Sequence, residues 1–169
     1  MPKTPRFLLQ FVGVGACLFT APALAAGGPD DPVKGVYAFA RQKHVDAPFA
    51  DKELRRRFFT ASFRAVAESI FGREIAANAE ILDGDPIDAT NGLVDEADLV
   101  VRVESAQRDR AMEKATFGSP KWRRSALYDV VKEGGAWRID DITDMPDKGS
   151  EPGWSVRKIS DDDLARSKK

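Results

Sequence analysis

The feature that most constrains the fold is a change in hydrophobic period near residue 97. Before it, apolar residues recur at helical spacing, as Val33, Val36 and Ala40 do along one predicted helix face. After it, Leu99 and Val101 begin a strict alternation, which is typical of a strand with one dry face. The chain is therefore predicted to be helical in its first half and built of strands in its second.

Three helices are predicted in the first half. The first opens at Asp31-Pro32, where the Asp31 side chain caps the helix and the missing proline N–H costs nothing. The second begins near Asp51 and ends at Gly72, a suitable C-terminal cap. A short third helix is expected from Glu74 to Leu82. The apolar stripe of the second helix is Phe59, Phe63, Val66 and Ile70.

Four strands are predicted in the second half, starting from residue 97, over 111–117, over 122–132 and over 136–142. Gly134-Gly135 is expected to form a tight hairpin turn, since glycine accepts positive φ. The connections are too short for helical crossovers, so the strands must be antiparallel. The expected fold class is α+β, with N-terminal helices packed on a curved antiparallel sheet.

The N-terminus has the anatomy of an export signal. Lys3 and Arg6 precede an apolar run over 7–20, and Ala23-Leu24-Ala25 supplies small residues for a signal peptidase. We expect cleavage after Ala25 and a periplasmic or secreted protein, with no membrane span after cleavage. The alternative is a lipoprotein processed at Cys17. The expected organisation is a leader over 1–25, one domain over 26–158 and a polar tail over 159–169.

Charge and cysteine content exclude several classes of protein. The chain has 26 Lys plus Arg against 27 Asp plus Glu, so it lacks the basic surface of a nucleic-acid binder. One Cys and one His cannot form a Cys/His zinc site, and no disulfide can form within the chain. We expect no metal and no cofactor.

The order of helices followed by a meander, over about residues 31–158, resembles the cone-shaped nuclear transport factor 2-like superfamily. More narrowly, the chain is similar to exported bacterial proteins grouped as domain of unknown function 3828. The similar segments are Gly84-Asp85-Pro86-Ile87-Asp88-Ala89-Thr90-Asn91, the hairpin strand Gly135 to Ile142, and the closing Gly153-Trp154-Ser155-Val156-Arg157. The resemblance implies a fold and an export address, but no reaction, because that family has no common activity.

An acidic cluster follows the predicted helices. Its carboxylates could attract a hard cation, but the spacing of a calcium loop is not kept, and we interpret the segment as a turn-rich junction. The cluster consists of Asp83, Asp85, Asp88, Asp95, Glu96 and Asp98.

No nucleophile elbow, phosphate-binding glycine loop or histidine-rich motif is present. His44, the only histidine, lies in a polar linker, where we expect it to be exposed. An isomerase or dehydratase inside the cone would use a carboxylate opposite a tyrosine. Its candidate residues are Asp140, Asp141, Tyr128, Tyr37, Arg102 and Glu104.

The sequence favours a non-catalytic binding module for a small apolar ligand or an envelope protein. Such folds open a concave apolar pocket at one end of the sheet. The candidate lining residues are Tyr37, Arg102, Phe117, Trp122, Tyr128 and Trp137, with Trp137 the best candidate for a core position. The alternatives are the cone-pocket enzyme and an immunity or inhibitor protein against an envelope toxin. We expect a monomer or a weak homodimer.

Overall fold

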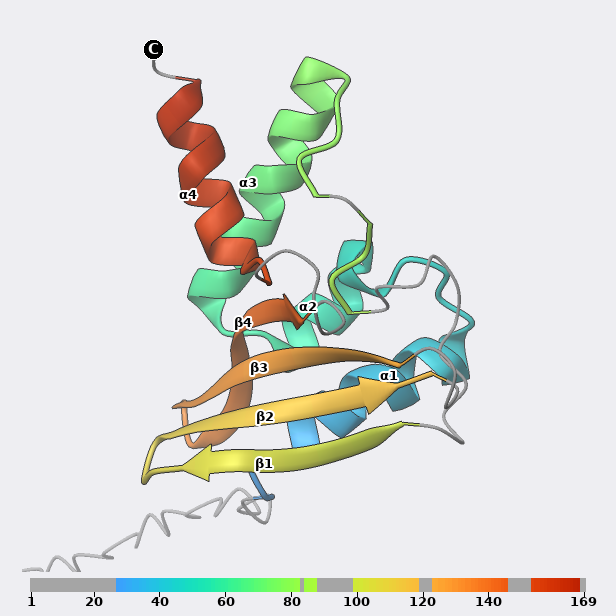
Figure 1. The fold of residues 1–169 in the computed structure, drawn as a ribbon, viewed down its shortest axis with the longest axis vertical. Coiled ribbons are helices and arrows are strands. Elements are labelled where there is room, and N and C mark those ends of the chain that lie inside the picture. Colours follow the sequence, from blue (N-terminus) through green and yellow to red (C-terminus); the bar gives the residue numbers. More distant parts are fainter. Residues whose placement is uncertain (1–26, 83, 88–98, 119–122, 146–152, 168–169) are drawn as a thin grey trace, which may run out of the picture.

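The computed structural model describes residues 27–82, 84–87, 99–118, 123–145 and 153–167. In these ranges the chain forms four α-helices, a short 3₁₀ helix and one four-stranded antiparallel sheet (Figure 1). The α+β class is therefore confirmed. The predicted leader lies outside the described residues.

The sheet is a simple meander with strand order β1-β2-β3-β4. Its strands are β1 (Val100–Ala106), β2 (Arg110–Phe117), β3 (Arg124–Glu133) and β4 (Ala136–Met145). Gly134 and Gly135 turn β3 into β4 with φ of 60° and 85°, as predicted. β1 is an edge strand, and a bulge shifts its register against β2 between Val103 and Ser105.

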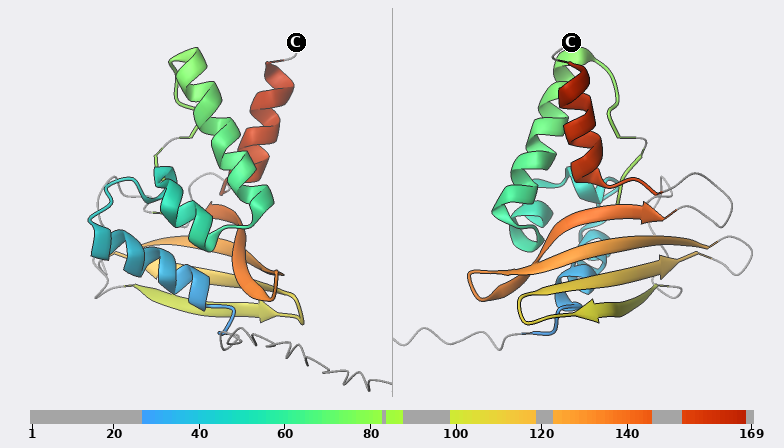
Figure 2. Two further views of the ribbon diagram at one scale, coloured as in Figure 1. Left: turned by 180° about the vertical axis from the view of Figure 1, so that it is seen from behind. Right: turned by 60° about the vertical axis from the view of Figure 1, so that its left-hand side comes forward.

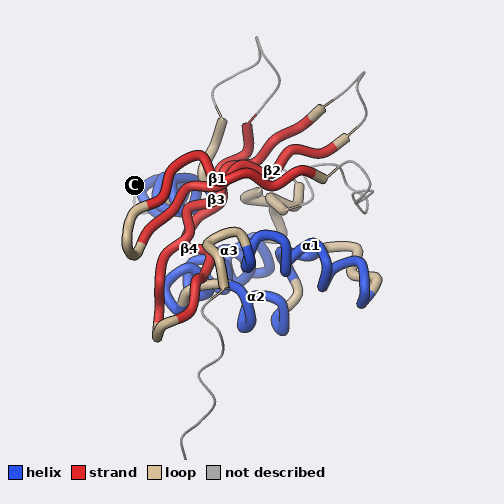
Figure 3. The backbone as a smooth tube through the Cα atoms, turned by 90° about the horizontal axis from the view of Figure 1, so that it is seen from below, coloured by secondary structure: helices blue, strands red, loops and turns tan. Residues whose placement is uncertain are grey.

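Helices cover one face of this sheet, which Figure 3 shows from below and Figure 2 from behind. α1 (Asp31–Lys43) and α2 (Lys52–Phe58) lie there, with η1 (Pro48–Ala50) between them in the chain. The predicted start of α1 is right, but Asp31 is its first helical residue rather than its cap. Asp30 holds the cap position with helical backbone angles, and its side chain makes no capping hydrogen bond. The first turn of α1 is thus only weakly capped.

The predicted single helix from Asp51 to Gly72 is wrong, because the helix is interrupted at Phe59 and Thr60, which have extended backbone angles. Phe59 bridges to Ile139 of β4, and the backbone N–H of Thr60 donates to the Ile139 carbonyl at 2.9 Å. The Thr60 hydroxyl then accepts from the Phe63 N–H and caps α3 (Ala61–Ala77). The apolar period runs through the break, since both helices pack against β4.

α3 also ends later than predicted. Gly72 lies inside it, and the left-handed cap is Asn78, with φ of 48°. The short helix expected from Glu74 to Leu82 is absent from the described part of that segment. Glu74 instead lies in the last turn of α3, and its carboxylate accepts from the N–H groups of Ile81 and Leu82.

α4 (Val156–Arg166) closes the described chain. It packs against α3, and the two helices extend together beyond the β4 edge of the sheet (Figures 1 and 2). Ser155 caps α4 by accepting from the Lys158 N–H. Ser160 is buried inside α4. The expected tail boundary at 159 falls within this helix.

The core lies between the helices and the covered face of the sheet. Aromatic rings dominate its helical side, where Phe49, Phe59 and Phe63 pack with ring centroids 4.8 to 6.0 Å apart. The sheet contributes small and branched residues, namely Ala115, Ala126, Val130, Ile139 and Ile142, with Tyr128. Among the described residues, no helix packs on the opposite face of the sheet.

Candidate functional site

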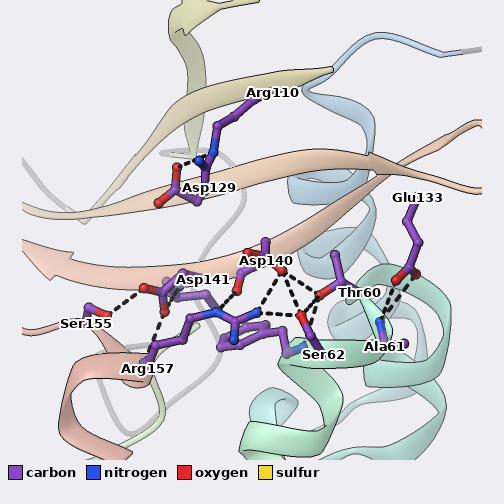
Figure 4. Close-up of polar contacts among 12 residues, drawn as sticks. Thr60, Ala61, Ser62, Arg110, Asp129, Glu133, Asp140, Asp141, Ser155 and Arg157 are labelled. Carbon is purple, nitrogen blue, oxygen red and sulfur yellow. Dashed lines mark hydrogen bonds and ion pairs between the residues drawn. The ribbon is translucent and has the colours of Figure 1, made fainter. Parts of the chain in front are cut away.

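The densest polar network joins β4 to the starts of α3 and α4 (Figure 4). The Arg157 guanidinium donates to the Asp140 carboxylate at 2.7 Å, to the Asp140 carbonyl at 2.6 Å and to the Ser62 hydroxyl at 2.8 Å. The Thr60 hydroxyl donates to the same carboxylate at 2.7 Å. Asp140, a sequence candidate for a general base, is therefore fully engaged in holding three elements together.

The neighbouring Asp141 belongs to the same junction. It accepts from the Ser155 hydroxyl at 2.6 Å and from the backbone N–H groups of Arg157 and Ile142. Burial raises the pKa of Asp141, while these hydrogen bonds pull it down. The closing Trp-Ser-x-Arg segment thus anchors α4 to β4, and we assign this network a structural role.

Three of the predicted pocket residues meet between α1 and the sheet. The phenol oxygens of Tyr37 and Tyr128 lie 2.8 Å apart, and the Tyr37 hydroxyl donates to the Ile87 carbonyl at 3.1 Å. Phe117 packs beside Tyr37 with ring centroids 6.3 Å apart. All three side chains are buried. The structure brings these residues together as packed core.

The other predicted pocket residues do not join them. Arg102 is exposed on β1, and Glu104 is exposed on the same strand. Trp137 is half-buried near the hairpin end of β4, where the Lys132 ammonium lies 5.0 Å from its ring centroid. Trp122 lies outside the described residues. His44 is exposed, as expected.

A residue that the sequence reasoning missed lies beside the tyrosines. Glu113 of β2 pairs in register with Tyr128 and is 0% exposed. Neither of its carboxyl oxygens has a hydrogen-bond partner among the described residues. Burial raises the pKa of Glu113 to about 7. The alternation of the sequence could have indicated this burial, because Glu113 lies between Ala111 and Ala115 on the face of β2 that is buried.

A pocket of about 200 Å³ lies elsewhere, between η1, the last turns of α3 and the segment before Ile87. Its aromatic wall is formed by Phe49 and Phe71, whose ring centroids are 5.7 Å apart. The remaining lining residues are Ala47, Ala50, Glu74, Glu80, Leu82, Gly84, Asp85 and Pro86. The sequence did not predict this pocket, because its lining residues come from three separate segments, within 47–50, 71–74 and 80–86, that carry no motif.

Polar groups hold the pocket in shape. Asp85 accepts from the Phe49 N–H at 2.7 Å, which ties the loop of the acidic cluster to η1. Buried Arg55 donates to the Phe49 carbonyl at 2.7 Å and lies 5.0 Å from the Phe71 ring centroid. The predicted role of Asp85 as a turn residue agrees with its bond to the Ile87 N–H. The other members of the acidic cluster lie outside the described residues.

No group of three or more His, Cys, Asp or Glu side chains in the described ranges could hold a metal ion. Among the helices described above, none has the length and apolar content to cross a membrane. A scan of the sequence against protein-family models finds no match, and a search of curated proteins finds none either.

Proposed function

We propose that this protein is an exported, non-catalytic binding module whose ligand occupies the pocket of Phe49 and Phe71. The observation that carries the proposal is the pocket itself, an apolar hollow with a few polar groups fixed at its wall. Pockets for drug-sized ligands measure about 300 to 1,000 Å³. A volume of about 200 Å³ suits a small ring compound or one side chain of a partner.

The chemistry of the wall restricts this ligand further. Glu74, Glu80 and Asp85 contribute carboxylates, and the described lining residues include no Lys or Arg. A neutral or cationic apolar ligand is thus favoured over an anionic one, whose charge would be repelled. The predicted export signal and the sequence resemblance to exported nuclear transport factor 2-like proteins support a role in the cell envelope. Mass spectrometry of the mature N-terminus tests cleavage after Ala25, and an intact Met1 or a lipidated Cys17 contradicts that cleavage.

A variant that fills the pocket tests the binding proposal. Ala50 lines the pocket and is exposed, so Ala50→Phe places a ring there without disturbing the core. Ala65→Phe is the matched control, because Ala65 is exposed on α3 and is not a lining residue.

Indole is a suitable probe, titrated into labelled protein and followed by amide NMR shifts. We expect shifts at residues around η1 and 84–87, at least tenfold weaker binding to the Ala50→Phe variant and unchanged binding to the Ala65→Phe variant. Shifts confined to other regions, or equal binding to both variants, would refute this site.

A cone-pocket isomerase or dehydratase is the second candidate function, favoured by the position of Glu113. A buried carboxyl with a pKa of about 7 lies beside Tyr128, which is a pairing of base and phenol donor suited to proton transfer next to a carbonyl. Incubation with small ketones in deuterated water tests it. Deuterium incorporation that disappears in the Glu113→Gln variant would favour the enzyme over the binding module.

A further inference from the structure

The face of the sheet that lies away from the helices carries two cations directly opposite each other (Figure 3). Arg102 of β1 and Lys114 of β2 are register partners. Along β2, Ala115 and Phe117 are buried toward the helices, so Lys114 and its partner project from the other face. Side chains opposed in this way have Cβ atoms about 4.5 to 5.5 Å apart, and like charges at that position destabilise a sheet.

The repulsion between these cations is not offset within the described residues. Neither Arg102 nor Lys114 forms an ion pair there. The next residues in the same row are Leu127 of β3 and Thr143 of β4, which carry no charge. Glu104 lies in the bulge of β1 and has no register partner on β2. The sheet therefore keeps a repulsive pair that its own carboxylates do not relieve.

The carboxylates of the neighbouring row are engaged elsewhere. Asp129 of β3 pairs with Arg110 at 3.7 Å, which Figure 4 shows. Its register partner Asp141 accepts from the Ser155 hydroxyl at 2.6 Å. Arg138 of β4 lies in the same row as Arg110 and adds a further positive charge. This face is thus suited to an anionic partner.

Apolar side chains surround the cation pair. Val100, two residues before Arg102, is 46% exposed, and Met112, two residues before Lys114, is 39% exposed. Leu127, the register partner of Lys114, is half-buried although no described helix covers this face. Residues two positions apart in a strand point to the same face, so these side chains form one patch with the cations. Exposed apolar side chains gathered in this way mark an interaction surface.

We propose that this patch, the outer-face site, binds an acidic segment of another protein. The partner's carboxylate lies between the Arg102 guanidinium and the Lys114 ammonium, and apolar side chains that flank it in the partner cover Val100, Met112 and Leu127. The like-charge repulsion of the free sheet is then replaced by attraction to the carboxylate. The outer-face site and the pocket of Phe49 and Phe71 share no residue, so this inference is independent of the proposed ligand.

The arrangement of the site favours a protein over two other occupants. Surfaces that bind membranes insert apolar side chains at their centre and keep cations around them, often with Trp or Tyr at the interface. In the outer-face site the cations lie at the centre, the apolar residues surround them, and none of the five residues is aromatic. A second copy docked face to face would bring two identical cation pairs together.

A blocked synthetic peptide of alternating Glu and Leu is a suitable probe, titrated into the labelled intact protein at low ionic strength. We expect amide NMR shifts over 100–103, 112–116 and 125–128, and binding that weakens as salt is added. Arg102→Gln and Lys114→Gln should each bind the peptide about fivefold more weakly. Arg56→Gln is the matched control, because Arg56 is exposed on α2, on the helical side of the sheet, and its loss should leave binding unchanged.

Thermal melting without any peptide tests the repulsion itself. Removing one cation of the pair should raise the Tm of Arg102→Gln and of Lys114→Gln by roughly 1 to 4 °C. Arg56→Gln should produce no such rise.

Four results would overturn the inference. One is equal binding of the peptide by Arg102→Gln and Arg56→Gln, and another is equally tight binding of a peptide with Gln in place of Glu. The third is a Tm that does not rise when either cation of the pair is removed. The fourth is a different occupant, shown by shifts of the outer-face site with phosphatidylglycerol vesicles but not with the peptide, or by self-association of the free protein that Arg102→Gln abolishes.

Discussion

Replacing Arg157 by Met should detach α4 from the sheet and destabilise the protein. The substitution keeps an unbranched apolar stem beside Phe63, above which the guanidinium lies at 5.4 Å. It removes the hydrogen bonds to the Asp140 carboxylate, the Asp140 carbonyl and the Ser62 hydroxyl. Asp140 keeps its bonds from Thr60 and Ser62, so no carboxylate is left bare.

The expected loss follows from these contacts. A hydrogen bond to a charged group contributes about 1.5 to 3 kcal/mol, and bonds of one guanidinium are not additive. The Arg157 side chain is 29% exposed and that of Asp140 is 22% exposed, so water replaces part of the interaction. We expect a decrease of about 3 kcal/mol in the free energy of unfolding, which corresponds to roughly 10 °C in Tm for a domain of this size.

Urea unfolding followed by tryptophan fluorescence measures this decrease. Arg166→Met is the matched control, since Arg166 is exposed at the far end of the same helix and, among the described residues, donates only to the Asp162 carbonyl at 3.4 Å. The control should change stability by less than about 0.5 kcal/mol. A loss below about 1 kcal/mol for Arg157→Met would refute the view that this network anchors α4.

Other substitutions give further tests. Because the pKa of Glu113 is raised on folding, its contribution to stability falls as pH rises from about 4.5 to 7. In urea unfolding, the free energy of unfolding of the wild type should therefore decrease by about 3 kcal/mol relative to that of Glu113→Gln over this pH range. Tyr37→Phe removes the phenol that donates to the Ile87 carbonyl and should cost about 1 to 2 kcal/mol by thermal melting. Gly35→Ala, normally stabilising inside a helix, should destabilise by about 1 to 3 kcal/mol because its methyl meets the Phe58 ring, and a gain in Tm would contradict that contact.

The class of fold and the order of its strands were predictable because they depend on local periodicity. The alternation over 99–103 predicts a strand and its two faces, and the pair Gly134-Gly135 predicts a turn. Neither prediction needs information about distant residues. The break at Phe59-Thr60 was not predictable in this way, since its cause is Ile139, eighty positions further along the chain.

The candidate sites show the same limit. Aromatic residues on two predicted elements could be expected to meet, and Tyr37 and Tyr128 do. Their burial depends on how closely α1 is seated, which a single sequence does not reveal. The pocket at Phe49 and Phe71 depends on where α3 ends, and element ends are set by long-range contacts such as the bond from the Phe49 N–H to Asp85.

The bulge in β1 has a consequence for behaviour at high concentration. An uncovered edge strand presents unpaired N–H and C=O groups on which another chain can grow a continuous sheet. The register shift between Val103 and Ser105 kinks and twists that edge, and Arg102 beside it is charged. An incoming strand can match only a few residues before its hydrogen bonds fall out of register, so the protein resists fibril-like growth from its β1 edge.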